Sequence, residues 1–383
     1  MMDNQRKLTL LAGSAVLVLL LTQLNKRRKR RQRDAEGVEA YDVTVDVEEG
    51  KGKATTTVQH IRTKESYSFG KGWAAGTPYP PFVTPERLQW LQGAVELRQG
   101  DVIVATFAKC GTTWLEQILL LLVARGDAGA LDPVHKNAYS AARGRGKVWL
   151  EAALSADGEF GAFGKRGEGT PVSLADFEDM PAPRVIKSHA RRRLLLGRGD
   201  AGDLPEGVRV VVVTRNPKDA CTSGYYHAFN PHKRGWPFAA WASAWAAGAV
   251  PSGSWFEWTR EWRDGEDWDR VDRLWIHYED MLDDPVDAVA RVARLLWPDE
   301  ALDQKLIETV AEKAGFSAMR AQIAAQDDDW AAGRGHMRKG TVGDWQNHFS
   351  PRLADDFEVL YHRHFKRTGL VYDQGSAELL SAY

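Results

Sequence analysis

Short apolar runs rich in β-branched residues divide the chain from residue 101 onward. They cover residues 101–106 (DVIVAT), 184–188 (RVIKS) and 208–214 (VRVVVVT). Runs of this length and composition are typical of strands buried inside a parallel sheet. Apolar residues at helical spacing follow the first run over 114–122, and a helix start follows the third at Pro217 and Asp219. The pattern predicts an α/β fold in three layers, a parallel sheet with helices on both faces.

The segment before this body has a different pattern. Apolar and polar residues alternate with a period of two over residues 41–47 (YDVTVDV), as in a strand. Residues 48–52 can form a turn, and residues 55–61 (TTTVQHI) can form a second strand that pairs with the first. We therefore expect residues 35–78 to be a linker with a possible hairpin. The main domain is expected over 79–372, and a C-terminal tail over 373–383.

The first 34 residues predict a membrane anchor. Residues 8–24 carry no charge, and as a helix they would reach about 25 Å, near the lower end of what crosses a bilayer. The sequence KRRKRR follows, so the density of basic residues places the body in the cytosol and the basic run against lipid headgroups. A cleaved signal peptide and a buried core helix are the competing interpretations, and an organelle membrane is the alternative location.

Composition and charge exclude several classes of protein. The net charge is −1, whereas a nucleic-acid binder is expected to carry a clear excess of basic residues. That value combines nine basic and two acidic residues up to Asp34 with 42 basic and 50 acidic residues beyond it. Two cysteines cannot form a disulfide framework. Fifteen tryptophans suggest a pocket with flat apolar walls, for which the segment from Trp236 to Trp262 is the candidate, although a Trp stripe at helical spacing is more often core.

The turn after the first strand has the features of a phosphate cradle. Lys109 and Gly111 lie in a tight loop between a strand and a helix start, where free backbone N–H groups gather around one point. Thr112 and Thr113 add hydroxyl donors. The Walker A pattern is absent because the Lys precedes the Gly, and GxGxxG is absent as well. An ordinary strand–helix turn is the alternative.

Two further strand ends and one loop carry basic residues. Arg215 follows the third strand. Its guanidinium could bind a phosphate through two N–H groups, or else pair with a nearby carboxylate. Lys187 and His189 end the second strand, where they are a candidate electrophile and a candidate general base. Arg338 and Lys339 begin a loop with two glycines, which alone would be read as solvated surface.

These segments together resemble the sulfotransferase family, in its cytosolic-type branch. The matching motifs are TFAKCGTTW (106–114), IKSH (186–189), TRNPKDACTS (214–223) and RKGTVGDW (338–345), with smaller matches at VWLE (148–151) and HYEDM (277–281). The resemblance runs in one order from about residue 79 to about residue 371. It implies the P-loop-like sulfotransferase fold and transfer of a sulfuryl group from 3′-phosphoadenosine 5′-phosphosulfate (PAPS), which leaves as 3′,5′-adenosine bisphosphate.

The resemblance also implies roles for individual residues. His189 matches the general base that takes the proton of an acceptor hydroxyl, or in a less favoured case an amine, on a small molecule. Lys109 would neutralise the leaving 5′-phosphate oxygen, and Lys187 would hold the sulfonate. No metal is implied. The implied nucleotide-binding residues are Lys109, Cys110, Gly111, Thr112, Thr113, Trp114, Arg215, Ser223, Tyr278, Phe316, Arg338, Lys339 and Gly340.

Departures from the family pattern leave alternatives open. Cys110 stands where the family has Ser, and Ala314 precedes Gly315 where the family has Thr-Ser. The family's dimer motif is not found, so the oligomeric state stays undetermined. A Mg-dependent nucleotide kinase or NTPase and a non-catalytic PAPS-binding membrane scaffold are the competing functions.

Overall fold

A computed structural model describes most of the chain. The described residues are 37–48, 50–74, 77–80, 83–130, 139–140, 145–155, 172–195, 204–227, 231–264, 271–324 and 337–365. The predicted anchor at 1–34 and the predicted tail at 373–383 lie outside these ranges. Within them, none of the helices has the length and apolar character needed to cross a bilayer.

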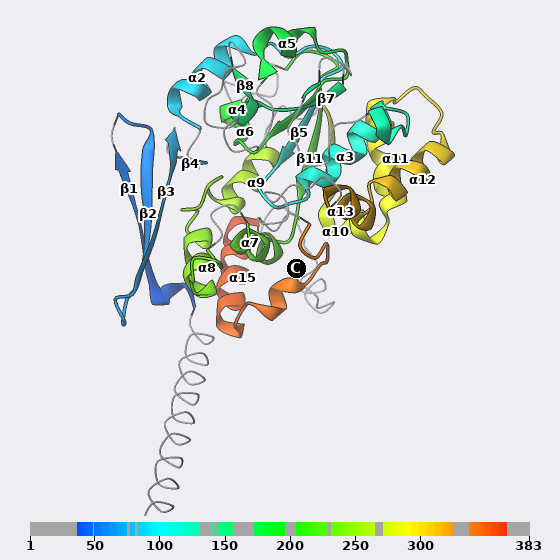
Figure 1. The fold of residues 1–383 in the computed structure, drawn as a ribbon. Coiled ribbons are helices and arrows are strands. Elements are labelled where there is room, and N and C mark those ends of the chain that lie inside the picture. The colour runs from blue at the N-terminus through cyan, green and yellow to red at the C-terminus, as the bar shows by residue number, and fades with distance from the viewer. Residues whose placement is uncertain are drawn as a thin grey trace, which may run out of the picture.

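A six-stranded sheet forms the centre of the molecule, in the order β12-β11-β5-β10-β7-β6 (Figure 1). Five strands run parallel, and β6 pairs antiparallel with β7 at one edge. All five residues of β5 are buried, as its apolar sequence predicts. The strand bounds are β5 (Val102–Thr106), β6 (Tyr139–Ser140), β7 (Arg145–Trp149), β10 (Val185–Ser188), β11 (Arg209–Thr214) and β12 (Asp272–His277).

Helices cover both faces of this sheet, which confirms the predicted three-layer α/β architecture. Val102 and Val104 of β5 pack in one cluster with α3, α11 and α12. Ile103 and Ala105 point the other way, into a cluster with α8, α9 and α15. On the first side lie α3 (Thr112–Val123), α10 (Tyr278–Asp283), α11 (Pro285–Leu296) and α12 (Gln304–Lys313), with α13 (Phe316–Ala324) beside Trp114. On the second lie α7 (Pro217–Tyr225), α8 (Phe238–Ala246), α9 (Trp255–Arg263) and α15 (Pro351–Phe365).

A smaller group of helices extends the second layer. It encloses its own apolar cluster around Phe177 and Met180, next to β7 and β10. These helices are α2 (Pro85–Ala94), α4 (Leu150–Ala153), α5 (Leu174–Asp179) and α6 (Arg192–Leu195). Short elements complete the description: β8 (Leu154–Ser155), β9 (Val172–Ser173), and the 3-10 helices η1 (Val38–Ala40), η2 (Ala128–Ala130) and η6 (Asp344–Asn347).

The N-terminal segment folds into an antiparallel sheet of four strands. The predicted hairpin is present as β1 (Tyr41–Glu48) and β2 (Lys53–His60), and β3 (Ser66–Ala74) and β4 (Thr77–Tyr79) extend it. Thr56 Oγ1 donates to Ala249 O at 2.7 Å, and Lys71 Nζ donates to the same oxygen at 2.8 Å. The sheet stands at the side of the central domain in Figure 1 and docks against the segment after α8.

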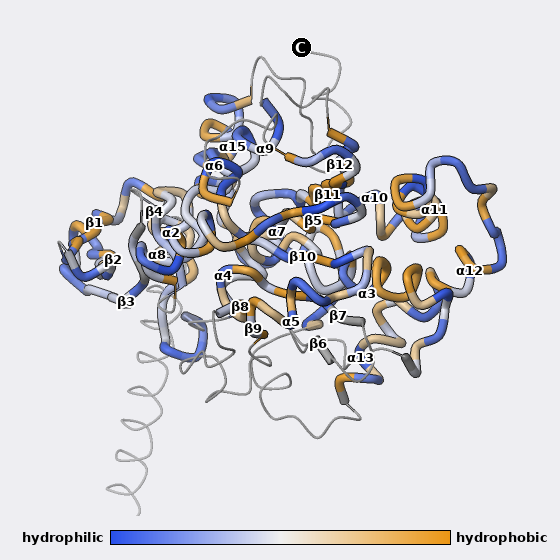
Figure 2. Tube along the Cα trace, turned by 90° about the horizontal axis from the view of Figure 1, so that it is seen from above, coloured by the Kyte–Doolittle hydropathy of each residue, from blue (hydrophilic) through white to orange (hydrophobic). Residues whose placement is uncertain are grey.

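The tryptophans between 236 and 262 form core, which is the more common of the two outcomes that the sequence analysis gave for a Trp stripe at helical spacing. Trp255, Trp258 and Trp262 are fully buried, because helical spacing on α9 turns them all toward the sheet. The Nε1 groups of Trp258 and Trp262 both donate to Ala190 O, at 3.0 and 3.2 Å. These bonds tie α9 to the segment that follows β10. In Figure 2 the central strands β5 and β11 lie inside the molecule, surrounded by helices.

Candidate active site

The loop between β5 and α3 is tightly folded. Lys109 has a φ of 74° and Gly111 a φ of 107°, both in the left-handed region. A Cβ on Gly111 would lie 2.8 Å from the Tyr278 ring, so only glycine fits there. The loop ends at the first turn of α3, whose N–H groups have no earlier helical carbonyl to bind. Free N–H groups around a tight loop are the feature from which the sequence analysis predicts an anion cradle here.

Four basic side chains gather beside this loop. Burial, together with the charges of Arg215, Lys187 and Arg338, lowers the pKa of Lys109 to about 7. Arg215 donates to Lys109 O at 3.3 Å and to Thr341 O at 3.0 Å, so it joins the two loops. Cations held this close repel one another unless an anion binds among them. The residues present therefore fit a polyanionic ligand.

The loop that begins at Arg338 is held from two sides. Arg338 and Lys339 both donate to the carboxylate of Asp344 in the same loop. Burial acts to raise the pKa of Asp344, but the hydrogen bonds from Lys339 and Arg338 outweigh it and hold the pKa well below its usual range. Asp219 of α7 accepts from Gly343 N at 2.7 Å and Trp345 N at 3.0 Å. Asp219 therefore fixes this loop beside α7, a role beyond the helix start predicted for it.

Aromatic rings lie beside the loop and its cations. Trp114 and Tyr278 meet edge to face with ring centroids 5.7 Å apart, and the Arg215 guanidinium lies 4.3 Å from the Tyr278 ring. Phe316 is packed so closely on Gly340 that a Cβ there would approach its ring to 2.3 Å. Flat rings next to a cationic loop are suited to an aromatic base attached to phosphates.

His189 is held in one tautomer at the end of β10. Its Nδ1 lies 2.7 Å from Thr106 O, so Nδ1 carries the proton and donates it to this carbonyl. Burial, with the nearby charges of Lys187 and Lys109, lowers the pKa of His189 to about 3. The Trp149 ring packs against the imidazole with centroids 5.1 Å apart. The imidazole is therefore neutral near pH 7, with its Nε2 lone pair available to accept a proton.

A buried carboxylate supports the backbone at His189. Glu151 Oε1 accepts from His189 N at 3.1 Å, from Ala190 N at 2.8 Å and from the Ser188 hydroxyl. The sequence indicated Glu151 only as part of a small motif match. Its contacts show that it positions the segment carrying the imidazole.

A second buried carboxylate, Glu116 of α3, was missed altogether. Glu116 Oε2 lies 2.7 Å from Lys147 Nζ, and its Oε1 lies 3.8 Å from Lys187 Nζ. Lys187 also lies 4.3 Å from the centre of the Trp149 ring. Burial lowers the pKa of Lys187, whereas Glu116 acts to raise it. The polar spacing along α3 and β7 could have signalled these residues, since each places a charge inside an otherwise apolar run.

The remaining predicted residues lie around the cradle in different environments. Cys110 is fully buried, burial raises the pKa of its thiol to about 12, and its N–H donates to Phe107 O at 3.2 Å. Cys110 thus belongs to the buried cluster that contains Phe107 and Trp255. Thr112 Oγ1 is 2.6 Å from Thr106 Oγ1, and Thr113 is half-buried in the first turn of α3. Ser223 is half-buried on α7, downstream of Arg215.

Comparison with known proteins assigns this arrangement to a family. A family profile described as a sulfotransferase domain matches residues 99–369, which includes all four motifs. The chain belongs to the sulfotransferase family. Rat sulfotransferase 2A1 is 27% identical to this sulfotransferase over 297 residues, covering 76% of this chain and 93% of the relative. Guinea pig sulfotransferase 1E1 is 27% identical over 288 residues, covering 72% and 87%.

Solved structures show the same fold. Retinol dehydratase in complex with androsterone and the inactive cofactor PAP superposes with a TM-score of 0.57 at 19% identity, covering 90% of this sulfotransferase and 96% of that chain. Mouse sulfotransferase SULT7A1 complexed with PAP gives a TM-score of 0.51 at 20% identity, covering 77% and 94%. In the part of this sulfotransferase that the structure describes, no group of three or more His, Cys, Asp or Glu side chains is placed to hold a metal ion.

Proposed function

We propose that this sulfotransferase moves a sulfuryl group from PAPS to a hydroxyl on a small-molecule acceptor. PAPS supplies the sulfuryl group and leaves as 3′,5′-adenosine bisphosphate. The observation that carries the proposal is the neutral imidazole of His189, held by Thr106 O beside a cationic cradle. A base and an anion site within one group of strand ends is the arrangement that in-line transfer requires.

The basic residues divide into two groups in this proposal. Lys109 neutralises charge on the oxygen that leaves, with Lys187 at the sulfonate and the amides of residues 110–113 around it. Arg215, Ser223, Arg338, Lys339 and Gly340 hold the 3′-phosphate, while Trp114, Tyr278 and Phe316 contact the adenine. Cys110 contributes through its backbone, since its thiol is buried.

His189 acts as the general base. Its Nε2 accepts the acceptor's proton, and the resulting imidazolium is stabilised by the bond from Nδ1 to Thr106 O. A pKa lowered by burial and by neighbouring cations is expected to rise once a polyanion neutralises Lys109 and Lys187. The base therefore gains proton affinity only when the donor nucleotide is in place.

The decisive experiment replaces this imidazole. His189→Ala is expected to lower the rate of bisphosphate release by about 100-fold or more while changing nucleotide affinity less than about threefold. Release is measured with a panel of hydroxyl and amine acceptors, and affinity by calorimetry. His362→Ala on α15 is the matched control and keeps full activity. Loss of nucleotide binding in His189→Ala would contradict the assigned role.

Two competing functions give different results in the same assays. A Mg-dependent kinase or NTPase would hydrolyse or transfer from nucleoside triphosphates, which the order Lys109 before Gly111 does not favour. A non-catalytic scaffold would bind PAPS without turnover. The tautomer of His189, which a scaffold does not need, favours an enzyme.

We propose also that residues 1–34 tether the enzyme to a membrane with its catalytic domain in the cytosol. The uncharged run 8–24 followed by KRRKRR supports this. The full chain is expected to stay with membranes after carbonate extraction, whereas a variant starting at Ala35 is released. Release of both proteins would contradict the tether, and protease protection of the body would contradict its orientation.

A further inference from the structure

Buried charged side chains meet on the face of the sheet that α3 covers. Glu116 of α3 lies against Lys147 of β7 and Lys187 of β10, and the three side chains are 1%, 3% and 10% exposed. The register of the two strands pairs Lys187 with Trp149, so the Trp149 ring belongs to the same face. That ring also packs on the His189 imidazole. A charged cluster therefore lies next to the proposed base.

The two carboxylate oxygens of Glu116 have different partners. Oε2 accepts a hydrogen bond from Lys147 Nζ at 2.7 Å. Oε1 lies 3.8 Å from Lys187 Nζ and accepts no hydrogen bond from the described residues. At that distance the carboxylate attracts the ammonium ion but is too far away to accept one of its N–H groups. Glu116 therefore holds Lys187 by charge without taking up a hydrogen-bond donor.

The charge of Lys187 depends on these neighbours. Burial lowers the pKa of Lys187, whereas Glu116 and Glu151 act to raise it and Lys147 acts to lower it. The Trp149 ring, whose centre is 4.3 Å from Nζ, also favours the ammonium form. An ammonium ion in this buried position therefore needs a carboxylate nearby to remain charged.

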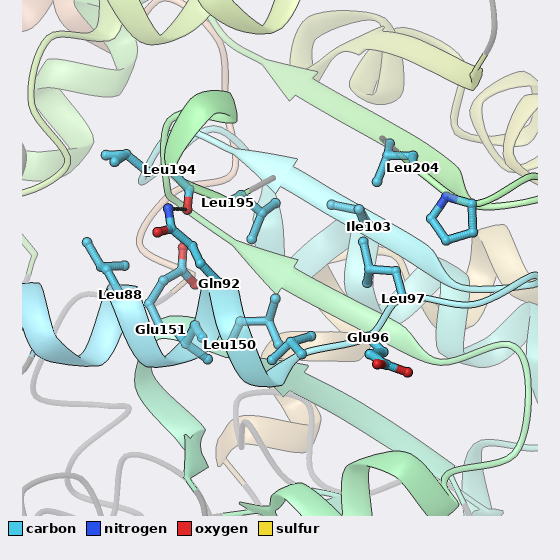
Figure 3. A pocket seen from close by; sticks show the side chains of 13 residues that line it. Leu88, Gln92, Glu96, Leu97, Ile103, Leu150, Glu151, Leu194, Leu195 and Leu204 are labelled. Atoms are coloured by element: carbon cyan, nitrogen blue, oxygen red, sulfur yellow. Dashed lines mark hydrogen bonds between the residues drawn. The ribbon is translucent and has the colours of Figure 1, made fainter. Parts of the chain in front are cut away.

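Glu151, the other carboxylate that acts on Lys187, lies on the opposite face of β10. Successive side chains of a strand alternate between its faces, and Glu151 Oε1 accepts from the residue 188 hydroxyl and from the N–H groups of residues 189 and 190. In Figure 3 Glu151 lies among the side chains of α2 and α6 that line a cavity of about 310 Å³. The carboxylate that lies within ion-pair distance of the Lys187 ammonium is that of Glu116.

We propose that Glu116 is a positioning residue for sulfuryl transfer, which keeps the Lys187 ammonium charged and beside the Trp149 ring without competing for the N–H groups that bind the sulfonate. Lys147 fixes this carboxylate by binding its other oxygen. The inference rests on the proposed function, in which Lys187 holds the sulfonate.

The contact with the sulfonate is measured by comparing PAPS with 3′,5′-adenosine bisphosphate, because the two ligands differ in that group. Both are titrated into the full chain by calorimetry near pH 7 without an acceptor. Glu116→Gln should weaken PAPS about tenfold and the bisphosphate by less than about threefold. An equal loss for both ligands, or no loss for PAPS, would overturn the inference. A wild type that neither binds PAPS nor transfers from it would refute the proposed function itself.

A second variant tests whether Glu116 acts through the ammonium ion. In a Lys187→Met background, Glu116→Gln should change the ratio of the two affinities by less than about twofold, because the group on which it acts is absent. A further loss of about tenfold for PAPS alone would assign Glu116 a separate route to the sulfonate and overturn the inference.

The pH dependence of kcat gives a readout that a merely structural role would not move. The charged form of Lys187 binds the sulfonate, so activity falls as the pH rises through its pKa. Loss of the Glu116 charge lowers that pKa, and the alkaline limb of kcat should move about one pH unit or more to lower pH in Glu116→Gln. An unchanged limb would overturn the inference. The variant keeps the other ionisable groups around Lys187, which are Lys109, Lys147, Glu151 and His189.

Two further variants separate this role from folding. Where Glu116→Gln does not fold, the double variant Glu116→Met, Lys147→Met removes both charges of the pair and should move the affinity ratio and the alkaline limb in the same directions. Asp101→Asn is the matched control. Asp101 accepts from Arg184 Nε at 2.7 Å, in a buried pair at the start of β5 and β10. This variant should lower stability and leave both readouts unchanged; a shift in either would attribute the effect to loosened strands and overturn the inference.

Discussion

Lys109 lies among other cations, so its protonation depends on what it binds. Burial and the charges of Arg215, Lys187 and Arg338 lower its pKa to about 7 in the free protein. At pH 8 most of the lysine is then neutral, and a bound polyanion raises the pKa again. Binding of 3′,5′-adenosine bisphosphate at pH 8 is expected to take up close to one proton.

Calorimetry in buffers of different ionisation enthalpy measures this proton uptake. Lys109→Met should remove it at pH 8, and the difference between the two proteins should vanish near pH 6, where the free lysine is already charged. Lys339→Met is the matched control: it weakens binding but keeps the uptake. Uptake that survives in Lys109→Met would assign the proton to another group.

The pKa of His189, lowered to about 3, couples stability to pH. In the unfolded chain a histidine titrates at about 6.5, so the unfolded state binds the proton first as the pH falls. The stabilising contribution is complete above about pH 6.5 and is lost as the pH falls toward 3. Between pH 6 and 4 the free energy of unfolding should fall about 1 kcal/mol per pH unit more steeply for the wild type than for His189→Asn. Parallel slopes in denaturant titrations would contradict this.

At the scale of elements, the close contact between Gly340 and Phe316 sets the position of a loop. Gly340 has a φ of 66°, and a Cβ would lie 2.3 Å from the Phe316 ring. Gly340→Ala should raise the KM for PAPS by about tenfold while changing kcat less, because the loop must move away from α13. Steady-state kinetics at saturating acceptor measure the split.

Gly343→Ala is the control for that variant. Gly343 has a φ of 82°, so alanine suffers the same left-handed strain, but nothing lies within 4 Å of the added Cβ. The contact with Phe316 is therefore the difference between the two variants. An equal rise in KM for both would attribute the effect to backbone strain alone.

For the whole molecule, the N-terminal sheet is part of the main core. Val58 and Phe69 are buried in the same cluster as the tryptophans of α8 and α9. Phe69→Ala is expected to lower the free energy of unfolding by about 3–5 kcal/mol. Val47→Ala, at a position that is 41% exposed, should change it by less than about 0.5 kcal/mol.

Truncation tests the same point at a larger scale. A variant beginning at Ala35 should keep the thermal midpoint of the folded body, whereas one beginning at Tyr79 should lose cooperative unfolding, because it exposes the face of the core that β2 and β3 cover. Calorimetry and circular dichroism follow both. Cooperative unfolding of the shorter variant at an unchanged midpoint would show that the sheet is dispensable.

The parts of this protein that local chemistry determines could be read from the sequence. An apolar run followed by Lys109, Gly111 and a helix start specifies a strand, a tight turn and an anion site within a few residues of one another. The same holds for Arg215 after β11 and for the hairpin of β1 and β2. The order of these motifs was enough to indicate the sulfotransferase family, which the family profile confirmed.

Tertiary structure decided what depends on partners distant in the chain. Glu116 meets Lys147 across 31 positions, and Asp219 meets Trp345 across 126, so no local pattern could pair them. The helical spacing of Trp255, Trp258 and Trp262 showed that they share one face, but only the packing of α9 on the sheet decided that this face is core. Glu151 illustrates both limits: its motif was visible, yet the three hydrogen bonds to its Oε1 exist only where α4 meets the end of β10. A sequence states which groups are present, whereas burial and the loss of water around them decide their charge and their use.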